Sequence, residues 1–187
     1  MKKLLKEWGI ILGIIGALYF TGLHTEVAGF LQQIILTTGL LRPEHIEENE
    51  QADAAYHFQL LNEQNESLPF TQFKGKTIFL NFWATWCPPC LAEMPDIHDL
   101  YLKMQNENVA FVLISQDKNF DKAKNFMERK GYTFPIYQLV SPLPQVFASS
   151  SIPTTFVISP KGKIIAKRVG MVKYDTESFR ELLLRGE

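Results

Sequence analysis

Apolar and polar residues follow two different periods along the chain from about residue 54 onward. Two short runs, residues 76–83 and 109–115, are almost wholly apolar, which is typical of strands buried in a sheet. Between them, apolar residues recur at spacings of three and four, as on the buried face of a helix. That helical pattern comprises Leu91, Met94, Ile97, Leu100, Tyr101 and Met104.

The remaining patterns predict further strands and helices in alternation. The expected elements are strands at 56–61, 134–139, 154–159 and 163–169, and helices at 121–130, 143–148 and 176–184. Gly131 is placed to end the first of these helices, and Pro160-Lys161-Gly162 forms a tight turn between the last two strands. This order predicts an α/β fold with a mixed sheet flanked by helices, parallel in part and antiparallel at one side.

The first 24 residues predict a membrane anchor. Lys2, Lys3 and Lys6 precede a run without charge, which is the pattern of a secretory signal, and the lysines are expected to stay cytoplasmic. The run is roughly 16 residues long, just under the usual span of about 20. A cleaved signal peptide is the alternative, but no convincing small-x-small cleavage site follows, so an uncleaved anchor with an extracytoplasmic domain is favoured.

Residues 25–53 are expected to connect this anchor to the domain at 54–187. The stretch Val27–Leu41 can form an amphipathic helix, which could lie at the membrane interface, support the anchor, or pack on the domain. A second membrane span would return the domain to the cytoplasm, but the stretch is short and carries Gln32 and Gln33. Residues 42–53 are polar and acidic, and indicate a linker.

Both cysteines of the chain lie in Trp86-Cys87-Pro88-Pro89-Cys90, between the strand at 76–83 and the following helix. The first turn of a helix carries unpaired N–H groups and the positive end of the helix dipole, both of which stabilise a thiolate. Cys87 is expected at the helix N-terminus and exposed, with Cys90 one turn further and more covered. This arrangement predicts a redox-active dithiol.

Other uses of the two cysteines fit less well. A zinc site needs further Cys or His ligands, and the four histidines, His24, His45, His57 and His98, are scattered singly. A structural disulfide would close a very short loop and gain little from loop entropy. We therefore expect neither a metal nor a cofactor, and the net charge of −1 gives no reason to expect nucleic acid as a partner.

The segment Asn81–Cys90, followed by Glu93 and Pro95 and later by Ile152-Pro153-Thr154-Thr155, resembles the thioredoxin superfamily. Within it, the chain is most similar to the membrane-anchored, extracytoplasmic TlpA-, ResA- and CcmG-like thiol:disulfide oxidoreductases. The resemblance covers about residues 54–185. The chain departs from cytosolic thioredoxin at Asn81, where that protein has a buried acid, and at Pro88-Pro89, where it has Gly-Pro.

The resemblance implies partners as well as a fold. The substrate would be an oxidised extracytoplasmic protein, in several relatives the haem-binding cysteine pair of apocytochrome c. Electrons would come through the membrane from a DsbD- or CcdA-like transporter. It also implies a cis Ile152–Pro153 bond beside Cys87; from the residues alone, a turn proline before a strand is the alternative.

Glu93 has two interpretations. An acidic residue early in a helix is favoured by the helix dipole. The resemblance instead implies a role near the thiols, where Glu93 would move protons to or from Cys90 and its charge would raise the thiol pKa. The expected catalytic residues are thus Cys87, Cys90 and Glu93, and the expected substrate contacts are Trp86, Pro88, Pro89, Ile152 and Pro153.

The motif favours reduction of the partner's disulfide. Pro88 and Pro89 have no N–H to donate to the Cys87 thiolate, and no histidine lies between the cysteines. A less stabilised thiolate favours the disulfide form and makes the dithiol a better reductant. The alternatives are a disulfide oxidase or isomerase, a thiol peroxidase on the same fold, or a binding module without redox turnover.

Overall fold

The computed structural model describes residues 51–105 and 107–186, together with Glu7, Trp8, Leu12, Gly13, Gly16, Gly29, Glu44 and His45. The expected anchor lies almost wholly outside the described residues. No helix within the described part has the length and apolar character needed to cross a membrane. The division into anchor, linker and domain therefore stays a prediction.

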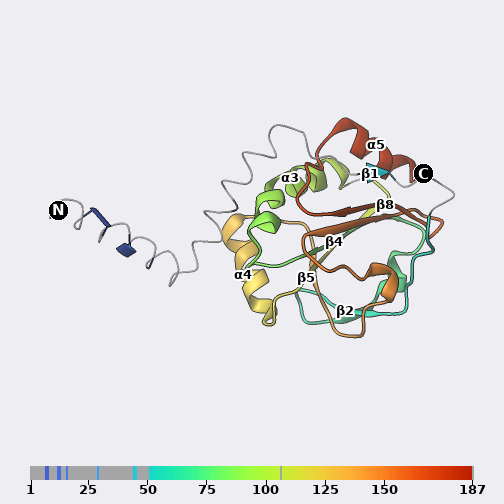
Figure 1. The fold of residues 1–187 in the computed structure, drawn as a ribbon. Coiled ribbons are helices and arrows are strands. Elements are labelled where there is room, and N and C mark those ends of the chain that lie inside the picture. Colours follow the sequence, from blue (N-terminus) through green and yellow to red (C-terminus); the bar gives the residue numbers. More distant parts are fainter. Residues whose placement is uncertain are drawn as a thin grey trace.

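A mixed sheet forms the centre of the fold (Figure 1), and its described strands run in the order β1-β8-β7-β4-β5-β6-β2-β3. The strands are β1 (Glu44–His45), β2 (Gln59–Leu61), β3 (Ser67–Pro69), β4 (Thr77–Trp83), β5 (Val109–Ser115), β6 (Ile136–Leu139), β7 (Thr154–Ile158) and β8 (Ile164–Val169). The helices are α3 (Pro88–Met104), α4 (Phe120–Lys130) and α5 (Glu177–Arg185), with the 3₁₀ turns η2 (Phe70–Phe73) and η3 (Gln145–Phe147).

The α/β fold with a mixed sheet is confirmed, and the antiparallel pairing expected at one side of the sheet occurs at both sides. β4, β5 and β6 are parallel, while β7, β8 and β1 on one side and β2 and β3 on the other are antiparallel. The strand expected at 56–61 is only three residues long, and it pairs with β6, far away in sequence. Which edge a short strand joins is decided by such long-range pairing.

Several local signals are confirmed. Gly131 ends α4 in the left-handed conformation with φ 69°, and Gly162 has φ 81° in the turn between β7 and β8. The helix expected at 143–148 is only the 3₁₀ turn η3, which follows Pro144. Part of the expected linker joins the sheet instead: Glu44 and His45 form β1 against β8, and Asp53 bridges to Lys163.

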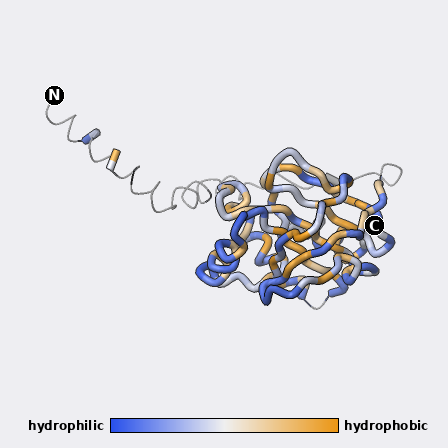
Figure 2. The backbone as a smooth tube through the Cα atoms, turned by 90° about the horizontal axis from the view of Figure 1, so that it is seen from below, coloured by the Kyte–Doolittle hydropathy of each residue, from blue (hydrophilic) through white to orange (hydrophobic). Residues whose placement is uncertain are grey.

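Two hydrophobic clusters lie on the two faces of the sheet, because strand side chains alternate between faces. Phe79 and Trp83 of β4 belong to the cluster shared with α3, α4 and α5. Ile78, Leu80 and Phe82 belong to the other cluster, beneath β2, η2 and η3. Apolar backbone positions accordingly gather in the centre of the domain (Figure 2). Asn81 lies two residues from both Phe79 and Trp83 on β4, so its side chain lies on the same face of the sheet and points toward α3.

Candidate active site

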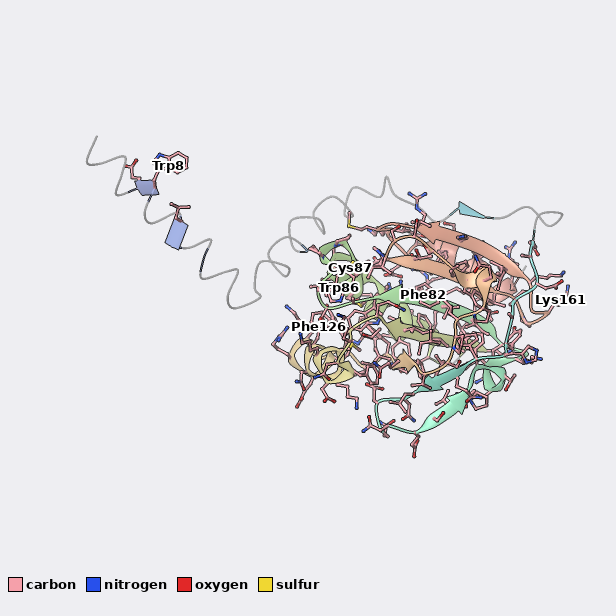
Figure 3. All side chains as sticks on the ribbon, turned by 60° about the horizontal axis from the view of Figure 1, so that its bottom comes forward. Trp8, Phe82, Trp86, Cys87, Phe126 and Lys161 are labelled. Atoms are coloured by element: carbon pink, nitrogen blue, oxygen red, sulfur yellow. A yellow bond between two sulfur atoms is a disulfide. The ribbon has the colours of Figure 1, made fainter. Side chains whose placement is uncertain are left out.

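The Cys87–Cys90 disulfide lies between the end of β4 and the first turn of α3. Cys87 is the N-cap of α3, its Sγ accepts a hydrogen bond from the Cys90 N–H (3.3 Å), and the two sulfurs are bonded to each other. Pro88 and Pro89 occupy the first helical positions, where their missing N–H groups cost no helical hydrogen bond. Figure 3 shows Trp86 and Cys87 at the end of the domain away from Lys161 in the β7–β8 turn.

The expected exposure of Cys87 is wrong. Cys87 is 4% exposed and Cys90 0%, so the expected order holds but both residues are buried. The cause is the segment before β7, which lies against Cys87: the Ile152 carbonyl oxygen is 3.7 Å from the Cys87 Sγ. Trp86, by contrast, is 57% exposed beside the disulfide.

The Ile152–Pro153 peptide bond is cis, as expected. Pro153 is buried, and its carbonyl accepts a hydrogen bond from the Gly170 N–H (2.8 Å). The Pro153 carbonyl is therefore already used within the fold, which leaves Ile152 as the residue of this pair that faces the cysteines.

A cleft of about 600 Å³ opens beside the disulfide. Its lining includes Trp86, Cys87, Pro88, Pro89 and Ile152, and on the other side Gln116, Ser149, Ser150 and Ser151. The lining residues that the structure describes carry no charge. Four of the five expected substrate contacts, all but Pro153, thus come together at one opening next to Cys87.

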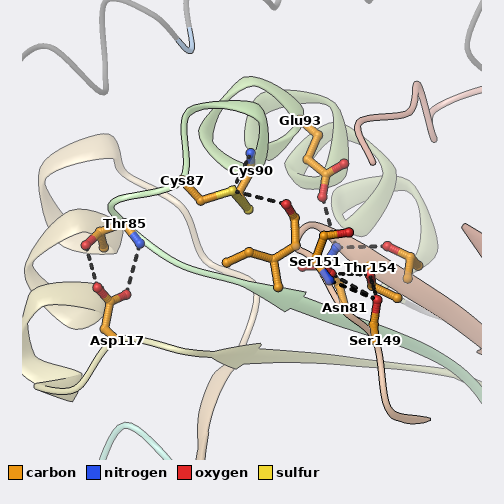
Figure 4. Close-up of a disulfide and its surroundings, with 11 residues drawn as sticks. Asn81, Thr85, Cys87, Cys90, Glu93, Asp117, Ser149, Ser151 and Thr154 are labelled. Carbon is orange, nitrogen blue, oxygen red and sulfur yellow. Dashed lines mark hydrogen bonds between the residues drawn. A yellow bond between two sulfur atoms is a disulfide. The ribbon is translucent and has the colours of Figure 1, made fainter. Parts of the chain in front are cut away.

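A small hydrogen-bonded group fixes the serine side of this cleft. The Thr154 hydroxyl donates to the Ser151 carbonyl (2.7 Å), and the Ser149 hydroxyl lies 3.0 Å from that carbonyl and 2.8 Å from the Thr154 hydroxyl (Figure 4). The bend that leads into the cis bond is therefore held by its own side chains.

Glu93 lies behind the disulfide and is fully buried. Its Oε1 accepts a hydrogen bond from Asn81 Nδ2 (2.9 Å), and that amide also donates to Thr155 Oγ1 (2.9 Å), which in turn accepts from the Tyr174 hydroxyl (2.6 Å). The other carboxyl oxygen, Oε2, is buried without a hydrogen-bond partner among the described residues.

Burial raises the pKa of Glu93 well above its usual range, and the interactions with the Asn81 amide and the Val172 backbone N–H offset only part of this shift. The carboxyl group thus keeps its proton to higher pH than an exposed glutamate. A charge on Glu93, expected from the sequence to act on the thiols, is present only above this raised pKa. Burial likewise raises the pKa of Tyr174 well above the ordinary value, which keeps its hydroxyl a donor.

A second buried carboxyl group, which the sequence analysis missed, lies on the other side of the disulfide (Figure 4). Asp117 follows β5 and accepts hydrogen bonds from the Thr85 N–H (2.9 Å), the Thr85 hydroxyl (2.7 Å) and the Ser115 hydroxyl (2.9 Å). Its position carried a usable signal: functional residues of α/β folds gather beyond the carboxyl ends of parallel strands. Gln116 sits at the same strand end.

The comparisons with known proteins agree with this geometry. A family model described as the AhpC/TSA family matches residues 52–167. The chain belongs to this family. Among characterised relatives, the thiol-disulfide oxidoreductase ResA of Bacillus subtilis is 29% identical over 188 residues, covering 100% of this chain and 96% of the relative. ResA of Halalkalibacterium halodurans is 31% identical over 133 residues, covering 70% and 76%.

Solved structures of other proteins share the fold. A thioredoxin-family thiol:disulfide interchange protein from Chlorobium tepidum TLS aligns with a TM-score of 0.62 and 27% identity, covering 74% of this chain and 99% of that one. StoA from Bacillus subtilis aligns with a TM-score of 0.54 and 26% identity, covering 69% and 94%. The AhpC/TSA protein described here has a thioredoxin-like fold and is a thiol:disulfide oxidoreductase, which confirms the resemblance seen in the sequence.

Proposed function

We propose that the protein is a membrane-anchored, extracytoplasmic reductase of protein disulfides that uses Cys87 and Cys90 as its dithiol. The observation that carries this proposal is the placement of the pair: Cys87 at the N-cap of α3 next to the open cleft, and Cys90 covered one turn further. Only Cys87 borders the cleft, so only Cys87 is placed to meet a disulfide on another protein.

The reaction follows from thiol–disulfide exchange. In the reduced protein, the Cys87 thiolate attacks one sulfur of the partner's disulfide, and the other partner sulfur leaves as a thiolate and takes up a proton. The Cys90 thiol then loses its proton and attacks the Cys87 sulfur of the mixed disulfide. The partner leaves as a dithiol, and Cys87–Cys90 is left oxidised, so two electrons have passed to the partner.

Glu93 is proposed to exchange protons with Cys90. It follows Cys90 by three residues on α3, a spacing that puts side chains on neighbouring positions of a helix. Its raised pKa and its unpartnered Oε2 favour a carboxyl group able to hold or release a proton inside the core. Asn81 occupies one oxygen and leaves the other for this exchange.

The cleft residues Trp86, Pro88, Pro89 and Ile152, with Pro153 behind them, are proposed to bind the segment around the partner's disulfide. An uncharged cleft beside an exposed indole suits an extended protein segment rather than a small charged metabolite. The partner is proposed to be an oxidised extracytoplasmic protein, with apocytochrome c as one candidate, and the electron donor a DsbD- or CcdA-like membrane transporter.

The reducing direction rests on the donors available to Cys87. Among the first helical residues, Pro88 and Pro89 supply no N–H, and the Cys90 N–H is the donor that remains at 3.3 Å. A thiolate with one such donor is stabilised less than one with several, and a less stabilised dithiol gives up electrons more readily.

The reduction potential of the full-length protein tests the direction. Equilibration with thiol buffers of known potential is expected to place Cys87–Cys90 near the roughly −270 mV of thioredoxin rather than the roughly −120 mV of the oxidase DsbA. A value close to the oxidase would overturn the reductase assignment while leaving the exchange chemistry intact. A reporter fused after Glu187 tests the location, since activity of a reporter that works only in the cytoplasm would contradict export.

A further inference from the structure

Asp117 accepts hydrogen bonds from Thr85, which lies two positions before Cys87. It is 4% exposed, and both of its carboxyl oxygens accept hydrogen bonds. Oδ2 accepts from the Thr85 backbone N–H (2.9 Å) and the Ser115 hydroxyl (2.9 Å), and Oδ1 accepts from the Thr85 hydroxyl (2.7 Å) (Figure 4). Two of the three donors thus belong to one residue, one from its backbone and one from its side chain.

Neighbouring backbone bonds fix the rest of the connection between β4 and α3. The Gln116 N–H donates to the Trp83 carbonyl (2.7 Å), and the Cys87 N–H donates to the Ala84 carbonyl (3.2 Å). The end of β5, at Gln116 and Asp117, is therefore tied to Trp83 and Thr85, the residues that carry the chain toward the disulfide.

Trp86 is the solvent-exposed residue of the segment between β4 and α3. It follows Thr85 directly, is 57% exposed, and lines the cleft together with Cys87. An exposed indole has few contacts of its own to hold its backbone. The bonds from Thr85 to Asp117 supply that restraint one residue before Trp86.

We propose that Asp117 is a positioning residue for disulfide exchange: by gripping Thr85 it sets how Trp86 and Cys87 face a bound partner. This inference rests on the proposed function, because it concerns how the same cleft meets its substrate. Exchange requires the attacking sulfur to lie in line with the partner's disulfide, and small misplacements of a reacting group cost large factors in rate. A grip on both the backbone and the side chain of Thr85 restrains the turn more tightly than either bond alone.

Substitutions of Thr85 or Asp117 test the two hydrogen bonds between them separately. Thr85→Val keeps the backbone N–H bond and removes the hydroxyl bond, while Thr85→Ser keeps both. Asp117→Asn removes the charge but can keep the shape, since its amide oxygen can accept from the Thr85 N–H and its NH₂ can donate to the Thr85 hydroxyl. Asp117→Ala removes both bonds. Thr176→Val is the stability control, because it loses the N-cap bond of α5 to the Phe179 N–H, and Thr176 is not among the cleft residues.

The test measures the rate of reduction of insulin by each reduced full-length variant at 25 °C, with the thermal midpoint recorded beside it. We expect Thr85→Val to lower the second-order rate constant at least about tenfold, and Asp117→Ala to lower it further. Thr85→Ser should restore most of the rate, and Asp117→Asn should stay above Thr85→Val. Thr176→Val should lower the thermal midpoint and leave the rate unchanged.

A second readout distinguishes positioning from general destabilisation. The pH midpoint of Cys87 alkylation should rise in Thr85→Val, because a displaced Cys87 loses its alignment with the Cys90 N–H, and it should not move in Thr176→Val. A wild-type rate and midpoint in Thr85→Val would overturn the proposal. Equal losses in Asp117→Asn and Asp117→Ala beside a normal Thr85→Val would also overturn it, since the charge would then be acting.

These outcomes are separable from failure of the proposed function. If wild-type protein did not reduce insulin at all, the reductase assignment would fail, whereas the alkylation midpoint of Cys87 would still report whether Asp117 positions it.

Discussion

The two cysteines of the Cys87–Cys90 disulfide have different neighbours. On the Cys87 side lie the uncharged cleft and Asp117, whose carboxyl oxygens are both hydrogen-bonded. On the Cys90 side lies Glu93, fully buried, with one oxygen bonded to Asn81 and the other without a partner among the described residues. Figure 4 shows the two carboxyl groups on either side of the disulfide.

The different hydrogen bonding of Asp117 and Glu93 suits them to different roles. A carboxylate that accepts several hydrogen bonds is held in place and can hold other groups in place. A carboxyl group that is buried and incompletely bonded keeps its proton more readily and is suited to proton exchange. We therefore propose that the partner binds on the Cys87 side of the disulfide and that protons are exchanged on the Cys90 side.

The largest expected effect concerns the sulfurs themselves. Cys90→Ser should accumulate mixed disulfides with partner proteins through Cys87, because the second attack is blocked. Cys87→Ser should accumulate few or none, since the remaining sulfur is covered. Nonreducing gels of cell extracts, compared with gels run after reduction, measure this. The reverse pattern would show that the covered side, not the cleft side, meets the partner.

A smaller effect is expected from Glu93. Glu93→Gln keeps the size of the side chain and can still accept from Asn81, but it cannot exchange a proton, so disulfide exchange should slow by about 10²-fold. Rates of insulin reduction from pH 5 to 9 provide the measurement. Asp99→Asn, at an exposed position of the same helix, is the matched control and should match wild type. Superimposable pH profiles for Glu93→Gln and wild type would remove the proton-exchange role.

The smallest effect is on stability and depends on pH. The pKa of Glu93 is raised in the folded protein, so its contribution to stability is fully present below the unfolded pKa of about 4.3 and is lost as pH rises through the folded pKa. Glu93→Gln has no such loss. We therefore expect its free energy of unfolding, relative to wild type, to increase as pH rises from about 4.

Urea unfolding of both oxidised proteins at several pH values measures this difference. The raised pKa of Glu63 is present in both proteins and cancels in the comparison, whereas the raised pKa of Asp96 does not cancel fully, because Asp96 interacts electrostatically with the Glu93 carboxyl group. A difference between the two proteins that does not change with pH would mean that the pKa of Glu93 is not raised in the folded protein.

What could be predicted from the sequence was local. The strand, the turn with its cysteines and the helix follow from periodicity over a few residues, and Gly131 and Gly162 mark their turns directly. Asn81 carried a further signal: a polar side chain in an apolar buried strand needs a partner, and Glu93 is that partner.

What could not be predicted depends on residues that are far apart in sequence. Thr85 and Asp117 are separated by 32 positions, and nothing near either one indicates the other. β1 is two residues long and is defined by its pairing with β8, so its own sequence could not reveal it. The burial of Cys87 likewise depends on Ile152, which is 65 positions away.

Gly29 links the catalytic helix to a part of the chain that precedes the domain. It is helical and buried, and a Cβ built on it would lie 3.0 Å from the Pro88 carbonyl oxygen and 3.2 Å from the Leu91 Cβ. The backbone at Gly29 thus lies close to α3 at the turn that carries Cys87 and Cys90, and a methyl group added there would be tightly packed against that turn. A larger residue at position 29 would have to displace the Pro88 carbonyl oxygen or the Leu91 side chain by a few tenths of an ångström, so the close contact between Gly29 and the cysteine-bearing turn depends on a single missing methyl group.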